Sequence, residues 1–196
     1  MACENFSADE LVIDIRAVEC YNICTMSEEK KAAATRYHRK ALAETADRLL
    51  VEHGYDGMNM NMLAKEAGYS KATVYVYFRS KDEIVRALCI DRLTLLRREF
   101  AAILHNDADL DEKLAAIKYA LDEFAAEDRV YFEFIGSSTF AAALSDASES
   151  EKQLSALISG ILTDLSALMP LSELKARWYS YYGEYKTAKM FDPDGE

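Results

Sequence analysis

Apolar residues recur at three- and four-residue spacing along most of the chain, which is the pattern of helices that bury one face. From Thr35 to His53 they fall on one such face, and glycines at positions 54 and 57 then end the helix. Only two prolines occur in 196 residues, and the helix-favouring Ala, Leu, Glu and Lys are abundant. The pattern therefore predicts an all-α fold.

Two short helices are expected in the segment that follows. Asn59 can cap a helix over 60–67 and Ser70 can cap a second over 71–77, because both side chains accept hydrogen bonds from backbone N–H groups of a first turn. The run YVYF favours a strand by propensity, but a helical chain offers it no partner strand. Two short helices joined by a turn that contains glycine predict a helix-turn-helix unit, whose second helix enters the major groove of DNA.

Longer helices are expected after this unit. Ser80 and Glu83 have the spacing of a capping box, which opens a helix that runs to about His105. Four further helices are expected, with Pro170 between the last two: 110–126, 129–144, 148–169 and 171–189. The expected architecture is a three-helix N-terminal unit joined by one long helix to a helical bundle.

Charge is distributed unevenly along a chain whose formal net charge is −11. Residues 1–25 contain one basic residue against five acids, residues 26–105 contain 14 against 11, and residues 106–196 contain 8 against 18. A polyanion such as DNA would be attracted to the middle segment and repelled by the rest. The asymmetry favours a nucleic-acid-binding module joined to a domain with another role.

The stretch AGYSKATVYVYFRSK, residues 67–81, contains three basic residues, four aromatic rings and no acid. A helix over 71–77 would direct Val74 and Phe78 into the core, and a carboxylate on its other face would repel phosphate. Toward the duplex it would present Lys71, Thr73 and Tyr77, with Arg79 and Lys81 beside the phosphates.

With these residues the segment from Thr35 to Leu88 resembles the TetR family of bacterial transcriptional regulators. The resemblance is carried by the helix that ends in HGYDG and by LAKEAGYSKATVYVYFRSKDEI, with its Tyr-x-Tyr-Phe-x-x-Lys ending. Ala72 stands where the family usually has Gly, and Asn59 where it usually has Thr. The resemblance implies contacts with bases or phosphates by Lys71, Thr73, Tyr75 and Tyr77 and a phosphate contact by Lys81.

The resemblance also implies how the rest of the chain is organised. Family members bind a small effector in the C-terminal domain and form homodimers through their last two long helices. We therefore expect a DNA-binding domain at 26–80 and a ligand-binding and dimerisation domain at 81–196. The expected function is regulation of transcription, with a repressor released from a palindromic operator by its effector as the leading form and an activator as the alternative.

Two other classes of function are compatible with a helical chain. A helical adaptor could keep this fold and bind a protein partner, but it would not need the basic Lys71, Arg79 and Lys81. An enzyme would need a nucleophile motif, a set of metal ligands or a phosphate-binding loop, and the sequence contains none of these. Double-stranded DNA is therefore the favoured partner, and no enzyme activity is expected.

The effector is expected to be small and apolar. Residues 106–196 carry 18 acids against 8 basic residues, so an anionic effector would meet a repulsive field unless a local Lys or Arg reversed it. Abundant aromatic residues favour a mostly apolar pocket between helices. We expect a neutral or cationic effector in a pocket lined by Phe100, His105, Tyr131, Phe134 and Ser138.

Nothing in the sequence indicates secretion or membrane insertion. Residues 1–25 lack a secretory signal, and no apolar run approaches the roughly 18 residues of a membrane span. The four cysteines form no C-x-x-C pair, and the histidines lack metal-ligand spacing. We expect a cytoplasmic protein with reduced thiols, no metal and no cofactor. Residues 1–25 are expected to be an extension or a start-site artefact that folding and DNA binding do not need.

Overall fold

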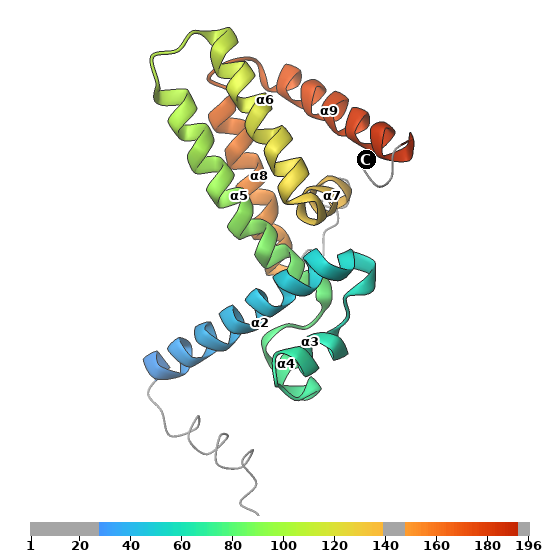
Figure 1. Cartoon of the computed structure of the whole chain (residues 1–196). Coiled ribbons are helices and arrows are strands. Elements are labelled where there is room, and N and C mark those ends of the chain that lie inside the picture. Colours follow the sequence, from blue (N-terminus) through green and yellow to red (C-terminus); the bar gives the residue numbers. More distant parts are fainter. Residues whose placement is uncertain (1–27, 139–147, 192–196) are drawn as a thin grey trace, which may run out of the picture.

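The chain is organised as a succession of α-helices (Figure 1). The computed structural model describes residues 28–138 and 148–191, and within these ranges all regular secondary structure is helical. None of these helices is long and apolar enough to cross a membrane. The all-α prediction is confirmed by α2 (Glu28–Gly57), α3 (Met60–Glu66), α4 (Lys71–Tyr77), α5 (Lys81–His105), α6 (Leu110–Glu127), α7 (Arg129–Ser138), α8 (Glu149–Leu165) and α9 (Leu171–Phe191).

The predicted caps define the starts of the central helices. Asn59 caps α3, Ser70 caps α4 and Ser80 caps α5, each by accepting a hydrogen bond from a first-turn backbone N–H group. The capping box expected at the start of α5 is only half formed. The Glu83 carboxylate accepts a hydrogen bond from the backbone N–H of Arg79 at 2.8 Å, one residue before the cap.

Helix α2 begins earlier than the pattern predicted, at Glu28 instead of Thr35, and it breaks at the expected glycine. Gly54 has a φ of 69° and Gly68, in the turn between α3 and α4, has a φ of 72°. Both values lie in the left-handed region that strains residues with a side chain. Residues 1–25, which were expected to be an extension, lie outside the described residues. So do residues 139–144, the expected end of the helix over 129–144.

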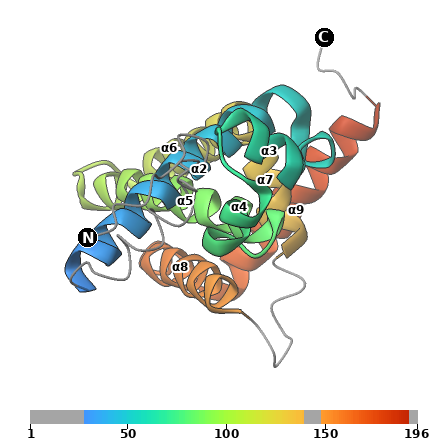
Figure 2. The same cartoon turned by 90° about the horizontal axis from the view of Figure 1, so that it is seen from below.

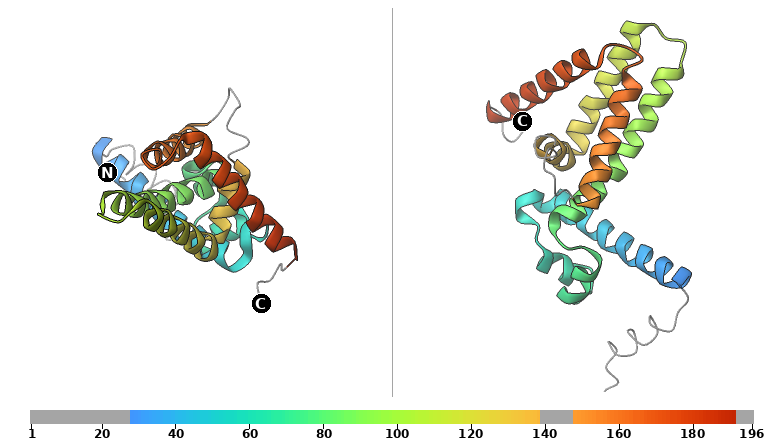
Figure 3. Two further views of the ribbon diagram at one scale, coloured as in Figure 1. Left: turned by 90° about the horizontal axis from the view of Figure 1, so that it is seen from above. Right: turned by 180° about the vertical axis from the view of Figure 1, so that it is seen from behind.

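The helices form two groups that α5 joins. Helices α5, α6 and α8 run side by side in the upper part of Figure 1, and α3 and α4 lie at the opposite end with part of α2. Seen from below, α3 and α4 are near the viewer (Figure 2). The N-terminal part of α2 projects away from the body, as the view from behind shows (Figure 3). Helix α5 therefore runs from the helix-turn-helix unit through the bundle.

Apolar side chains fill the interior of the helix-turn-helix unit and belong to one core that continues into the bundle. Leu42, Leu50 and Leu63 are fully buried, together with Val74 and Phe78 from the α4 region. Burial of each such side chain contributes about 1.5–3 kcal/mol. The prediction that Val74 and Phe78 point inward is confirmed, and their burial fixes which face of α4 meets solvent.

A cluster of aromatic rings joins α9 to α6 and α7. Phe132, on α7, is fully buried, and its ring centroid lies 4.7–6.1 Å from those of five other rings. We call this set the aromatic cluster: Phe124, Phe132, Trp178, Tyr181, Tyr182 and Tyr185. Helix α9 also contacts α8, so the aromatic cluster adds α6 and α7 to its neighbours.

Gly136 allows α9 to approach α7 closely. A Cβ atom at this position would overlap the ring of Tyr182, so a side chain would force that ring to move. Beside this contact the Tyr185 hydroxyl donates a hydrogen bond to Glu133 at 3.0 Å. Burial, reinforced by the Glu133 charge, raises the pKa of Tyr185 to about 12, so the phenol keeps its proton at neutral pH.

Candidate DNA-binding surface and ligand cavity

Helix α4 buries one face and exposes the other. Val74 is fully buried, whereas Lys71, Ala72, Tyr75 and Val76 are exposed. The Lys71 ammonium lies 6.0 Å above the ring of Tyr75. The exposed face therefore combines one cation, one aromatic ring and two apolar side chains.

Two predicted contact residues, Thr73 and Tyr77, are only partly exposed because each has a partner within the protein. The Thr73 hydroxyl lies 2.8 Å from that of Ser70. The Tyr77 ring stacks on His38 of α2 with ring centroids 5.3 Å apart, and the His38 Nδ1 atom lies 2.6 Å from the Tyr69 hydroxyl. Both side chains are thus oriented before any DNA is bound.

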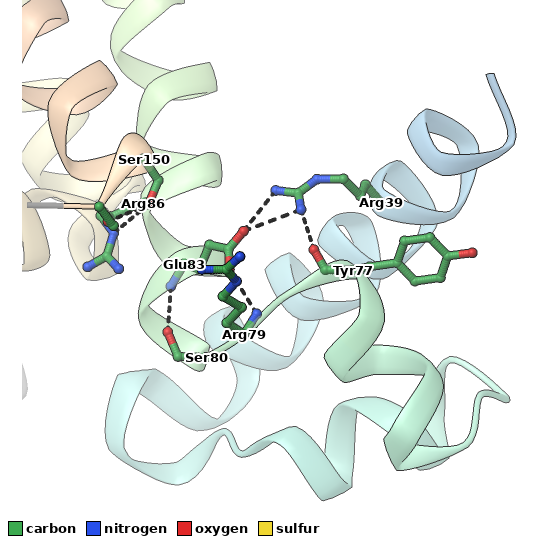
Figure 4. Close-up of polar contacts among 8 residues, drawn as sticks. Arg39, Tyr77, Arg79, Ser80, Glu83, Arg86 and Ser150 are labelled. Atoms are coloured by element: carbon green, nitrogen blue, oxygen red, sulfur yellow. Dashed lines mark hydrogen bonds and ion pairs between the residues drawn. The ribbon is translucent and has the colours of Figure 1, made fainter. Parts of the chain in front are cut away.

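Arg39 of α2 ties the end of α4 to the start of α5 (Figure 4). Its guanidinium donates a hydrogen bond to the backbone carbonyl of Tyr77 and pairs with the Glu83 carboxylate at 3.3 Å. It also lies 4.1 Å above the ring of Phe78. These contacts hold the C-terminal end of α4 in a defined position relative to α2 and α5.

Lys81 was predicted to contact phosphate, but in the structure its ammonium group forms hydrogen bonds within the protein. Its ammonium donates hydrogen bonds to the backbone carbonyls of Tyr55 at 2.7 Å and Met58 at 3.2 Å. It also lies 4.0 Å above the Tyr55 ring. The kinked chain after Gly54 brings these carbonyls to α5. A phosphate contact by Lys81 would have to use its one remaining N–H group.

Lys71 and Arg79 are the predicted cations that remain uncompensated. Both are exposed, and neither forms an ion pair within residues 28–138 and 148–191. No acid occurs between positions 67 and 81 to offset them. Positive charge is therefore presented at both ends of α4.

A cavity of about 660 Å³ lies between α5, α6, α8 and α9. Its wall is mostly apolar and includes Leu93, Leu96, Phe100, Ile117, Leu121, Phe124, Ile135, Ile158, Ile161, Leu165 and Trp178. A cavity of this size and polarity suits a small apolar molecule.

Of the four predicted pocket residues whose side chains the structure describes, Phe100 alone lies on this wall. Tyr131 points instead toward α2, and Phe134 packs on the ring of Tyr55 with centroids 5.7 Å apart. His105 is exposed at the end of α5, where its ring nitrogen lies 2.7 Å from the carbonyl of Ala101. The Ser138 side chain lies outside the described residues. The predicted set is therefore not brought together.

Charged side chains of both signs lie at the cavity edge. Lys118, Lys175 and Arg177 line the cavity together with Glu184. Lys118 pairs with Asp122 at 2.8 Å and Arg177 with Glu173 at 3.0 Å, whereas Lys175 forms no ion pair in the described parts of the chain. Lys175 is therefore the cation at this edge whose charge no ion pair offsets.

Comparison with known proteins agrees with this geometry. A family model described as "Bacterial regulatory proteins, tetR family" matches residues 42–88, which include α3 and α4 with the start of α5. The resemblance to the TetR family is thus confirmed over these residues. The match supports the prediction of a DNA-binding regulator, and the relatives that the chain matches are transcriptional regulators.

The relatives that the chain matches include two regulators named BetI. The chain is 36% identical over 92 residues to that of Agrobacterium fabrum, with 45% of each chain covered, and 28% identical over 145 residues to that of Rhizobium meliloti, with 69% of this chain and 68% of the other covered. The first match thus spans less than half the length of the relative.

Solved structures of the TetR type share the fold. The transcriptional regulator FadR of Bacillus subtilis, in complex with stearoyl-CoA, has a TM-score of 0.57 at 17% identity and covers 80% of this chain and 89% of its own. A TetR/AcrR-family regulator of Thermobifida fusca has a TM-score of 0.51 at 20% identity, covering 67% of each chain.

A polar network joins helix α2 to the bundle. Asp47 of α2 accepts hydrogen bonds from Arg92 of α5, at 3.0 and 3.2 Å, and from the Tyr131 hydroxyl of α7. Arg92 also pairs with Asp128, at the end of α6, at 3.3 Å. One arginine therefore connects α2 with the junction of α6 and α7.

Burial shapes the protonation of this network. It raises the pKa of Asp128 above its usual range even though Arg92 acts in the opposite direction. It also raises the pKa of Tyr131, whose bond to Asp47 adds to the effect. The phenol therefore remains a donor, and Asp47 has two donors from different helices.

Sequence reasoning missed several residues of these sites. Arg39 and Asp47 lie on the predicted helix from Thr35 to His53, but their partners are 44 and 45 residues away along the chain. The basic run from Arg36 to Lys40 was the signal available for Arg39. Val76 was not considered as a contact residue, and Ala72 was noted only as a departure from the Gly that is usual in the family.

Proposed function

We propose that this regulator binds a palindromic operator as a homodimer through α4, represses transcription there, and is released when a small apolar effector occupies the cavity. Residues 26–80 would form the DNA-binding domain, and residues 81–196 the ligand-binding and dimerisation domain. The observation that carries the proposal is the exposed, acid-free face of α4 with uncompensated cations at both ends. The same chain holds an apolar cavity that α5 connects to this face.

Two copies of α4 are needed for a specific site. One recognition helix contacts too few base pairs to select a site in a genome, whereas a two-fold dimer reads two half-sites about 34 Å apart. The phosphate contacts supply affinity at every sequence, and the exposed side chains of α4 supply the discrimination.

Selection of genomic DNA fragments by the full chain tests the proposal. We expect a palindromic site, and we expect Lys71→Ala to weaken binding to all sequences and to lower the slope of log affinity against log salt by about one. Lys152→Ala, an exposed substitution on α8, is the matched control and should leave the slope unchanged. If Lys71→Ala bound as the parent does, α4 would not be the DNA-binding element. If the chain selected no DNA, the leading hypothesis would be a helical adaptor that binds a protein partner.

The cavity supports an apolar body for the effector. A neutral or cationic effector is predicted from net charge, but Lys175 at the cavity edge forms no ion pair in the described residues and offers a partner to an anionic head group as well. We therefore propose an effector with an apolar body, and the charge of its head group is to be determined by experiment. FadR of Bacillus subtilis was solved with stearoyl-CoA, so acyl-CoA belongs among the test ligands.

A thermal-shift screen with lipophilic cations, neutral aromatics and acyl anions tests the cavity. A ligand at 100 times its Kd should stabilise the fold by about 2.7 kcal/mol and should then release DNA. Leu96→Phe fills the cavity and should abolish the shift, whereas Leu95→Phe, 56% exposed on the same helix, should not. A ligand whose effect survived Leu96→Phe would bind elsewhere.

A further inference from the structure

The exposed face of α4 carries two apolar side chains without a role in the fold. Val76 is 78% exposed, the largest fraction among the exposed large apolar residues of the described chain. Ala72 lies four residues earlier, on the same face of the helix, and is also exposed. The core on the other side of α4 is formed by Val74 and Phe78.

Folding does not explain the choice of valine at position 76. At 78% exposure Val76 buries little apolar surface, and its branched Cβ makes it a poorer helix former than alanine or lysine. Lys71 and Tyr75, also on the exposed face, are polar or amphipathic and tolerate water. The apolar pair Ala72 and Val76 would therefore gain free energy only when a binding partner covers it.

The major groove of DNA offers one apolar group to such a pair. Among the base edges exposed there, thymine alone presents a methyl group, at C5, and the other groups are hydrogen-bond donors and acceptors. Side chains four residues apart on a helix are about 5–6 Å apart at Cβ, which places them over neighbouring base pairs. Ala72 also differs from the Gly that the family usually has, and it supplies a methyl group that Gly lacks.

We propose that Ala72 and Val76 recognise thymine methyl groups, so that each operator half-site contains thymines at the base pairs that these two side chains cover. The inference rests on the proposed function, in which α4 occupies the major groove. Charge at Lys71 and Arg79 binds the phosphates of any sequence, whereas the apolar pair discriminates. Burial of one methyl group corresponds to about a fourfold change in affinity.

The experiment uses the operator selected by the full chain and replaces its thymines one at a time with deoxyuridine, which lacks only the methyl group. We expect a loss of about fourfold at specific thymines in each half-site. Val76→Ala should remove the loss at one of them, and Ala72→Ser, which substitutes a hydroxyl for a hydrogen of the methyl group, should change the loss at another.

Val51→Ala is the matched control, because Val51 is 75% exposed on α2 and should leave every uracil penalty unchanged. Operator binding that is indifferent to uracil, or uracil penalties that persist in Val76→Ala and Ala72→Ser, would overturn the inference while leaving the proposed function intact. Failure of the chain to select any DNA would overturn both.

Discussion

Replacement of Phe132 with alanine is expected to lower the free energy of unfolding by about 3–5 kcal/mol, the largest effect of any single substitution considered. The ring is fully buried and touches residues of α6 and α9 through the aromatic cluster. Its removal leaves a cavity that the rigid rings around it fill only in part. Urea denaturation followed by circular dichroism measures the change.

Tyr119→Ala serves as the control for this prediction. Tyr119 is an aromatic residue on α6 that is 61% exposed, so its removal should change stability by less than about 0.5 kcal/mol. A Phe132→Ala variant as stable as Tyr119→Ala would show that α9 is not held by the aromatic cluster.

Substitution of Asp47 with alanine is expected to cost about 1–3 kcal/mol, because it leaves two donors from other helices without their acceptor. The Arg92 guanidinium loses its partner on α2, and the Tyr131 hydroxyl loses the carboxylate that accepts its hydrogen bond. Urea denaturation at neutral pH measures the cost. Asp91→Ala removes an exposed carboxylate from α5 and should have little effect.

Asp128→Asn should be tolerated better than Asp47→Ala at neutral pH. Burial raises the pKa of Asp128, so its charged form is disfavoured in the folded protein. The wild type should gain stability relative to Asp128→Asn as the pH falls through this raised pKa toward the 3.8 of an ordinary aspartate. A constant difference between wild type and Asp128→Asn across that range would contradict the role of burial.

Local features of the fold could be predicted because their causes lie within a few residues. The caps at Asn59, Ser70 and Ser80 each need one side chain and a first turn, and the inward direction of Val74 follows from helix periodicity. The half-formed capping box shows the limit of such reasoning. Glu83 has the expected spacing, but Arg39, 44 residues earlier, competes for its carboxylate.

The site could be predicted only in part for the same reason. Lys71 and Arg79 could be predicted because the absence of acids around them is visible in the neighbouring sequence. The hydrogen bonds that direct Lys81 into the protein could not, because they are made to carbonyls 23 and 26 residues away. Tyr131 was assigned to a pocket because it is aromatic, and its actual direction is set by Asp47, 84 residues earlier. Helix periodicity identifies a buried face without showing which helix covers it.

Trp178 gives this protein an optical signal of its own. It is the single tryptophan of the chain, it lines the cavity, and it stacks on Tyr182 with ring planes 10° apart. Any molecule that enters the cavity changes the polarity around one indole, and no second tryptophan masks the change. Emission excited at the red edge of the indole band therefore reports cavity occupancy without a label, in the same sample in which operator binding is followed.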